Sequence, residues 1–212
     1  MSNYECPVIE QWTRCDTLYF SRNSGLSGCR DERTLAGGKD VVDGRTTNPP
    51  AILSRLVQMF RDEPNGQDLN ALLHKVLDVA IEVAAADKGT LHRLDDESSC
   101  LKIVASRGFS GSVLKYFETV YRNTNTTCAA ALKRRMRVVV DDVTTSYLFV
   151  GTGELGIMRA ADVAAAHSTP IISSSGHFWG VFTVHFRYPQ PSDRYDPTPL
   201  DRLAVLLADF LV

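Results

Sequence analysis

The sequence lacks the features that mark secreted, metal-stabilised and membrane proteins. Cysteine is scarce and odd in number, without a Cys-x-x-Cys pair, at positions 6, 15, 29, 100 and 128. We therefore expect neither a disulfide framework nor a metal cluster, and a reducing cytoplasm is the expected location. No apolar run approaches the roughly 20 residues of a membrane-spanning helix, and no basic segment followed by an apolar one indicates an export signal.

A strong net charge is also missing. Lys and Arg total 23 against 25 Asp and Glu, a formal charge of −2 at pH 7. The charge therefore gives no reason to expect nucleic acid or an acidic membrane as a partner. What remains is the composition of an ordinary globular protein, 44% hydrophobic and 23% charged, in a chain of 212 residues. That length suits one domain of about 150 residues with an appendage.

The N-terminal quarter is poor in residues that build a core. Residues 21–50 are dense in Arg, Asp, Gly, Asn and Thr, and they end in Asn-Pro-Pro. Such a segment buries too little apolar surface to offset the entropy of ordering it. We expect a largely disordered arm over residues 1–50, a linker helix over 51–66 and a folded domain over 67–212.

The stretch from Ala166 to Phe186 has the strongest core-forming pattern. Two apolar runs, 167–172 and 178–186, flank Ser-Ser-Ser-Gly-His and predict a β-hairpin. The second run is apolar on both faces, with Phe178, Gly180, Phe182, Val184 and Phe186 on one and Trp179, Val181, Thr183 and His185 on the other. A strand without a wet face must be covered on both sides. The face with a hydroxyl and an imidazole, which need partners when buried, is the candidate site.

The remaining elements are typical of the α+β class. Apolar spacing predicts helices from Asp68 to about residue 86, after residue 110, over 127–135, over 157–166, and after Thr198 as N-cap. β-Branched runs predict a hairpin over 89–94 and 100–106 and a strand over 137–140. This order predicts an antiparallel sheet with helices on both faces.

Residues 151–156, Gly-Thr-Gly-Glu-Leu-Gly, match the G-x-G-x-x-G pattern of dinucleotide-binding loops. That use requires a preceding strand, a βαβ unit and an acidic residue about 20 positions further on. Here Thr-Thr-Ser-Tyr-Leu-Phe-Val precedes the glycines, and Ser-Ser-Gly-His stands where the acid should be. We therefore interpret the segment as a mobile loop over a pocket.

Three other features allow both a chemical and a structural interpretation. Cys128 begins a helix, whose amides would lower the pKa of its thiol, but a small residue buried among alanines is the interpretation we favour. The basic run 133–137 is interpreted as capping a helix C-terminus rather than as binding phosphate. His167 and His185 are expected on neighbouring strands, yet two histidines without a third ligand make a weak metal site.

Several blocks together resemble a known family. They are Asp87-Lys-Gly-Thr90 with Ala105-Ser-Arg-Gly-Phe109, then Thr127–Ala131, Arg137–Val143 and Tyr147–Gly151, and last Ala166–Ile171, Gly176–Phe186 and Pro189. Their order and spacing, from about Gln67 to Val212, are similar to GAF domains of bacterial signalling proteins, especially those next to sensor histidine kinases.

The resemblance implies a six-stranded antiparallel sheet, a small-molecule pocket between the sheet and inserted helices, and terminal helices that commonly dimerise on the opposite face. We expect no cofactor. The pocket residues it suggests are Phe109, Phe117, Cys128, Phe149, Met158, Ala161, Ser168, Pro170, Thr183 and His185, for most of which core packing is the alternative.

The chain also departs from specialised relatives. The Asn-Lys-Phe-Asp-Glu signature of cyclic-nucleotide-binding members is missing, and Ala166 stands before His167 where bilin-binding members have cysteine. Cys128 falls near one cysteine of the free methionine-R-sulfoxide reductases, but their other active-site cysteines and the Asp-x-x-Ser-Glu strand entry are missing.

We therefore expect a cytoplasmic, non-catalytic sensory module that binds a small molecule and signals through its terminal helices. Its expected partners are a second copy of the chain and a histidine kinase or another signalling protein. Two alternatives stay open, a thiol-dependent reductase that uses Cys128 and a dimerisation scaffold without a ligand.

Overall fold

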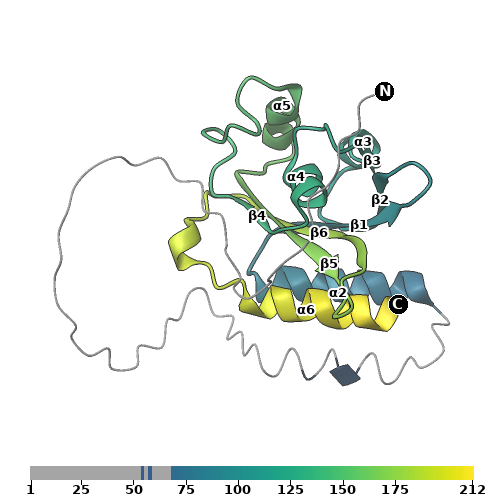
Figure 1. Cartoon of the computed structure of the whole chain (residues 1–212). Coiled ribbons are helices and arrows are strands. Elements are labelled where there is room, and N and C mark those ends of the chain that lie inside the picture. The colour runs from purple at the N-terminus through teal and green to yellow at the C-terminus, as the bar shows by residue number, and fades with distance from the viewer. Residues whose placement is uncertain (1–53, 55–56, 59–67) are drawn as a thin grey trace, which may run out of the picture.

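The computed structural model describes residues 54, 57–58 and 68–212. The arm predicted over residues 1–50, and the linker helix predicted over 51–66 apart from those three positions, lie outside the described residues. From residue 68 onward the chain forms an antiparallel sheet covered by helices on both faces (Figure 1). The α+β fold class and the six-stranded sheet expected from the sequence are confirmed.

The sheet has the strand order β3-β2-β1-β6-β5-β4. Its strands are β1 Lys88–Asp95, β2 Cys100–Arg107, β3 Thr119–Val120, β4 Val138–Val140, β5 Ala165–Ile172 and β6 Phe178–Phe186. The predicted hairpins are confirmed as β1–β2 and β5–β6. Strand β3 was not predicted, because two residues are too few to show an alternating pattern.

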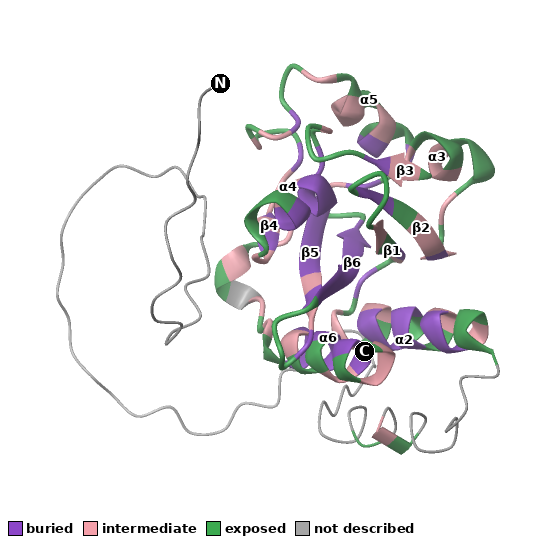
Figure 2. Cartoon of the chain, turned by 45° about the vertical axis from the view of Figure 1, so that its right-hand side comes forward, coloured by how far each residue is buried: buried purple, intermediate pink, exposed green. Residues whose placement is uncertain are grey.

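Strand β6 lies between β1 and β5, and all nine of its residues are buried (Figure 2). A β-bulge against Ile172 alters its alternation at the start, because Phe178 pairs with Ile172 while Gly180 pairs with Ile171. Trp179 is the extra residue. It therefore packs on the same face as Phe182, whereas Phe178 packs on the opposite face, and the faces predicted for these two aromatic residues were wrong.

Helices α2 Leu69–Val83 and α6 Thr198–Leu211 lie side by side across one face of the sheet (Figure 1). The leucine and alanine stripes predicted for them are buried, that of α2 mainly against β1 and β2 and that of α6 mainly against β5. Asp68 caps α2 as predicted, with its carboxylate accepting from the amide of Ala71 at 2.9 Å. The start of α6 differs, since Thr198 is already helical and its amide donates to Oδ1 of Asp196 at 3.0 Å.

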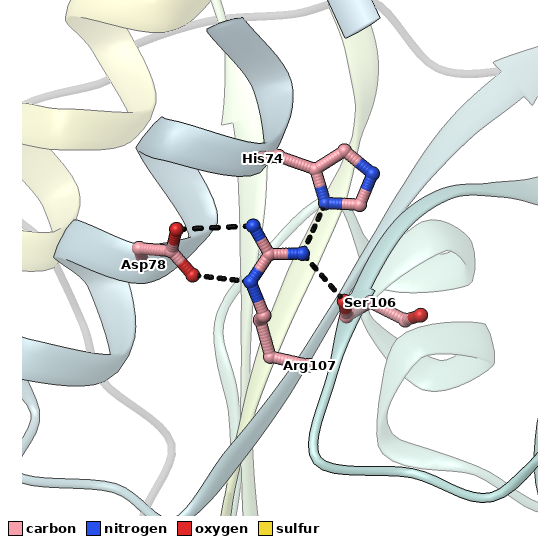
Figure 3. Close-up of polar contacts among 4 residues, drawn as sticks. All are labelled: His74, Asp78, Ser106 and Arg107. Carbon is pink, nitrogen blue, oxygen red and sulfur yellow. Dashed lines mark hydrogen bonds and ion pairs between the residues drawn. The ribbon is translucent and has the colours of Figure 1, made fainter. Parts of the chain in front are cut away.

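Arg107 at the end of β2 ties the sheet to α2 (Figure 3). Its Nε and Nη2 donate to the two carboxylate oxygens of Asp78 at 2.6 and 3.1 Å, and its Nη1 lies 2.6 Å from Nδ1 of His74. A guanidinium can only donate, so Nδ1 of His74 must accept and the ring hydrogen is on Nε2. This clamp fixes how α2 lies on the edge of the sheet.

The opposite face is covered by α3 Gly111–Tyr116, α4 Thr127–Arg134 and α5 Gly153–Ala160 (Figure 1). The helix predicted over 157–166 was wrong in its bounds, because α5 starts inside the glycine-rich motif and Ala165 already belongs to β5. Only α4 is strongly buried. Helix α3 has no buried residue, and Met158 is the single buried residue of α5.

Candidate functional site

A small cavity lies between the sheet and the three inserted helices. Its floor comes from β1 and β6, and its walls come from α4, from Met158 of α5 and from the segment around α3. The residues that line it are Thr90, His92, Phe109, Val113, Leu114, Phe117, Thr126, Thr127, Cys128, Met158 and His185. Free space in the cavity amounts to about 20 Å³, which is room for one or two water molecules.

Two buried histidines face this cavity from adjacent strands. Nε2 of His92 lies 3.3 Å from the carbonyl oxygen of Phe117. A carbonyl can only accept, so Nε2 carries the hydrogen and Nδ1 of His92 presents a lone pair. That Nδ1 and Nδ1 of His185 are buried and have no hydrogen-bond partner among the residues that the structure describes.

Burial keeps both imidazoles neutral. Loss of hydration lowers the pKa of His92 to about 4, although the contact with the Phe117 carbonyl opposes the change. Burial likewise lowers the pKa of His185 to about 3, helped by His92 and by the ammonium of Lys88. The ring of His185 meets that of Phe109 edge to face at 4.9 Å between centroids. The two imidazoles in the floor of the cavity are therefore uncharged at neutral pH.

Lys88 does not line the cavity but contacts Phe109, which does. Its ammonium donates to the carbonyl of Ala161, just after α5, and lies 5.6 Å from the centroid of Phe109. Strand β1 is thereby linked both to the end of α5 and to the aromatic wall of the cavity.

The thiol of Cys128 is held in a neutral state. Thr126 is the N-cap of α4, and its hydroxyl accepts from the amide of Ala129 at 3.2 Å and lies 3.2 Å from Sγ of Cys128. Burial raises the pKa of Cys128, and the hydrogen bonds from Thr126 and the helix amides only reduce that effect. The small-buried-residue interpretation fits this geometry better than a thiolate does.

The buried hydroxyl of Thr183 needs a hydrogen-bond partner, and it finds one in a chain of three hydroxyl groups. Oγ of Ser168 lies 2.7 Å from Oγ1 of Thr183 and donates to Oγ1 of Thr127 at 2.8 Å. The three hydroxyls join β6, β5 and the first residue of α4. They therefore fix α4 on the sheet, and of the three only Thr127 reaches the cavity wall.

The structure brings half of the suggested pocket residues together. The cavity is lined by Phe109, Phe117, Cys128, Met158 and His185. The other five do not line it: Phe149 and Ala161 pack with Met158 under α5, Ser168 and Thr183 belong to the hydroxyl chain, and Pro170 is half-buried on β5.

Sequence reasoning missed Thr90 and His92 on β1, which contribute directly to the cavity floor. They stand two positions apart, on either side of the buried Leu91, and that alternation was the signal that could have revealed them. His167, considered as a neighbour of His185, lies instead on the far face of the sheet, 4.4 Å from the ring of Tyr195. Its register partner Val184 faces α2 and α6, which accounts for the separation.

Two absences hold for the part of the chain that the structure describes. No three His, Cys, Asp or Glu side chains come close enough to hold a metal ion. Helices there are too short or too polar to cross a membrane.

Three solved structures show the likeness of this fold. The GAF domain of a phosphoenolpyruvate-protein phosphotransferase from Acinetobacter is 14% identical, with a TM-score of 0.61, over 78% of this chain and 94% of that one. A domain of a putative two-component sensor histidine kinase from Sinorhizobium meliloti 1021 is 16% identical, with a TM-score of 0.52, over 68% and 90%. The free methionine-R-sulfoxide reductase of Neisseria meningitidis, in complex with its substrate, is 18% identical, with a TM-score of 0.57, over 78% and 90%.

At these identities the structural likeness concerns the fold alone. No curated protein matches the chain. A family model for the GAF domain does match, over residues 68–211, which is nearly the whole of the folded part described above. The chain therefore belongs to the GAF domain family.

Proposed function

We propose that this protein is a cytoplasmic sensory module that binds a small molecule in the cavity between its sheet and its inserted helices. One observation carries the proposal: two residues that line the cavity, His92 and His185, each have a buried imidazole nitrogen, Nδ1, without a hydrogen-bond partner among the described residues. An unpaired buried polar atom costs about 1–3 kcal/mol. A ligand that donates a hydrogen bond to it recovers much of that cost.

The cavity walls define the chemistry of the ligand. Phe109, Val113, Phe117 and Met158 offer apolar contact, and Nδ1 of His92 offers a lone pair. The ligand is therefore a small, largely apolar molecule with at least one N–H or O–H donor. Since the present space holds only a water or two, binding requires the weakly buried helices α3 and α5 to move outward.

Signalling would pass through the strand that the cavity shares with the terminal helices. His185 faces the cavity, while Val184 and Phe186 on the same strand pack against α2 and α6. A ligand shifts the packing of these helices only by its difference in affinity for the two arrangements. The proposed outputs are a homodimer through the terminal helices and control of a histidine kinase or another signalling partner.

The reductase alternative is supported by the fold of the Neisseria enzyme and by the position of Cys128 in the cavity. Burial, which raises the pKa of that thiol, argues against it. Activity on free methionine sulfoxide that is lost in Cys128→Ser would establish the reductase and overturn the sensor. The scaffold alternative predicts that no molecule is retained at all.

Native mass spectrometry of the protein purified from its own host tests the proposal. We expect an added mass that is released when the protein unfolds. His92→Phe, which removes the lone pair, should lose it. His167→Phe is the matched control, because His167 is equally buried but lies on the other face of the sheet, and it should retain the added mass. Equal retention in both variants would contradict a site at His92.

A further inference from the structure

A second hollow, distinct from the cavity, lies at the other end of α4. Residues 126–128 at the start of that helix line the cavity, whereas Leu132 and Arg135 at its end line the second hollow. The two have no lining residue in common. The residues that line the second are Leu94, Asp96, Arg122, Leu132, Arg135, Gly176, His177 and Phe178. We refer to it as the distal groove.

The distal groove is large enough for a small molecule. Its volume of about 330 Å³ falls at the lower end of the range of ligand sites in proteins, about 300–1,000 Å³. Its sides come from the tips of the β1–β2 and β5–β6 hairpins and from the loop after β3. The apolar part of the lining is smaller than the polar part. It comes from Leu132 and Phe178, which are buried, and from Leu94, which is partly buried, and we call these three residues the apolar floor.

Two guanidinium groups lie beside this floor, and neither forms an ion pair with a residue that the structure describes. Arg122 forms no hydrogen bond or ion pair with any residue that the structure describes. Arg135 stands one residue past α4 with a left-handed backbone, and its Cζ lies 5.4 Å from the ring centroid of Phe178. Within the described part of the chain, the one polar contact of its guanidinium is long, 3.5 Å from Nη2 to the carbonyl of Gly176. Most N–H groups of both arginines are therefore free to donate.

The surrounding charges do not cancel this donor pair. Asp96 is the one acidic residue of the lining, and it forms no ion pair with either arginine. The C-terminal carbonyls of α4 are partly negative, but the amide of Arg135 already donates to the carbonyl of Ala131. His177 adds a ring nitrogen to the same side. The lining thus has two cations against one anion above an apolar base.

We infer that the distal groove is a second binding site, for a small organic anion that has a carboxylate or phosphate on an apolar body. Arg122 and Arg135 bind the anionic group, and Leu94, Leu132 and Phe178 contact the body. Arginine forks match the geometry of both anions, and charge-assisted hydrogen bonds are about twice as strong as neutral ones. Asp96 weakens binding by repulsion. This site is independent of the function proposed for the cavity.

Nuclear magnetic resonance titration of the full chain at constant ionic strength tests the inference. The probes are phenyl phosphate and benzoate. The controls are inorganic phosphate, which has no apolar body, and benzyl alcohol, which has no anionic group. We expect saturable shifts of the Gly176 and His177 amides with the two aromatic anions, and weaker binding of either control. Arg122→Gln and Arg135→Gln should each weaken binding about tenfold, the value of roughly one charge-assisted hydrogen bond.

Two further variants test whether the affinity changes with the charge of the groove in the expected direction. Asp96→Asn should strengthen binding about twofold to threefold, as expected for one exposed like charge. Arg202→Gln, on an exposed position of α6 outside the groove, should leave it unchanged. A lack of saturation at millimolar probe, weaker binding in Asp96→Asn, or equal weakening in Arg202→Gln would each overturn the inference. The side chain of Arg122, in the loop after β3, has no hydrogen-bond or ion-pair partner among the described residues. Arg122→Gln therefore tests binding even if Arg135→Gln disturbs the end of α4.

Discussion

Buried histidines make the stability of this fold depend on pH. Burial lowers the pKa of His92 to about 4, and of His167 and His185 to about 3, from a model-peptide value of 6.5. Below pH 6.5 the unfolded chain therefore binds protons that the folded chain does not. These histidines therefore leave the free energy of unfolding unchanged above pH 6.5. As the pH falls from 6.5 toward about 4, each lowers that free energy by about 1.4 kcal/mol per pH unit.

His167→Phe isolates one of these contributions. The ring packs between Phe186 and Tyr195, and neither ring nitrogen has a partner in the described structure. A phenyl ring keeps the aromatic contacts and removes the buried polar atoms, so we expect equal or greater stability at pH 7. Urea unfolding between pH 7 and 4.5 should show that one fewer proton is taken up on unfolding. An unchanged slope would contradict the burial of a neutral imidazole here.

Cys128 should react slowly because burial raises the pKa of its thiol. We expect alkylation by iodoacetamide at pH 7.5 to be more than about tenfold slower in the folded protein than in urea, since only the thiolate reacts. Peptide mass spectrometry distinguishes Cys128 from the other four cysteines. Fast modification of Cys128 in the folded state would favour the reductase alternative.

At the scale of the elements, Gly180 sets the distance between β1 and β6. It pairs with Arg93, and a Cβ at this position would overlap the carbonyl oxygen of His92 and lie 3.1 Å from the Cα of Arg93. These obstacles are backbone atoms of a central strand, which cannot turn aside. We expect Gly180→Ala to destabilise the fold by about 3 kcal/mol or more, at or above the upper end of the range typical of overpacked cores, because the obstructing atoms belong to the backbone.

Gly156→Ala is the matched control for Gly180→Ala. Gly156 is exposed within α5, and a Cβ there would meet no atom within 4 Å. Alanine stabilises an exposed helix position by about 0.5–1 kcal/mol relative to glycine. Thermal unfolding should therefore shift in opposite directions for the two variants. A small effect of Gly180→Ala would show that β1 and β6 separate easily.

The elements that the sequence predicted well are those with a long, uninterrupted pattern. The apolar stripes of α2 and α6 and the β-branched runs of β5 and β6 fall where expected, because packing supports the local preference of each. The errors are local. Ala165 and Ala166 favour helix, yet pairing with Phe186 and His185 places them in β5. The bulge at Trp179 depends on its partner strand, which the sequence of β6 does not reveal.

At the scale of the whole molecule, the site could be predicted only in part. The parity of β6 identified His185, and the resemblance suggested Phe109, Phe117, Cys128 and Met158. Neither revealed that His92 lines the same cavity as His185, because this depends on β1 lying beside β6, and the two strands are far apart in the chain. The distal groove could not be predicted either, since its lining comes from β1, α4, β6 and the loops beside them, which are far apart in the chain.

The two sides of the sheet differ in how firmly they are held. Helices α2 and α6 each bury six residues against the sheet, whereas α3 buries none and α5 buries only Met158. Local opening requires little free energy where few apolar contacts are lost. We therefore expect α3 and α5 to open and close as units while the sheet and terminal helices stay folded.

Hydrogen exchange followed by nuclear magnetic resonance measures this difference. Amides of α3 and α5 should exchange with opening free energies at least about 3 kcal/mol below those of β6, which should exchange only on global unfolding. Met158→Ala removes the one buried side chain of α5 and should speed exchange there while leaving β6 nearly unchanged. If α3, α5 and β6 instead exchange together, the covering helices cannot part without unfolding. A cavity of about 20 Å³ could then admit no ligand larger than water, and the sensory function would have to be abandoned.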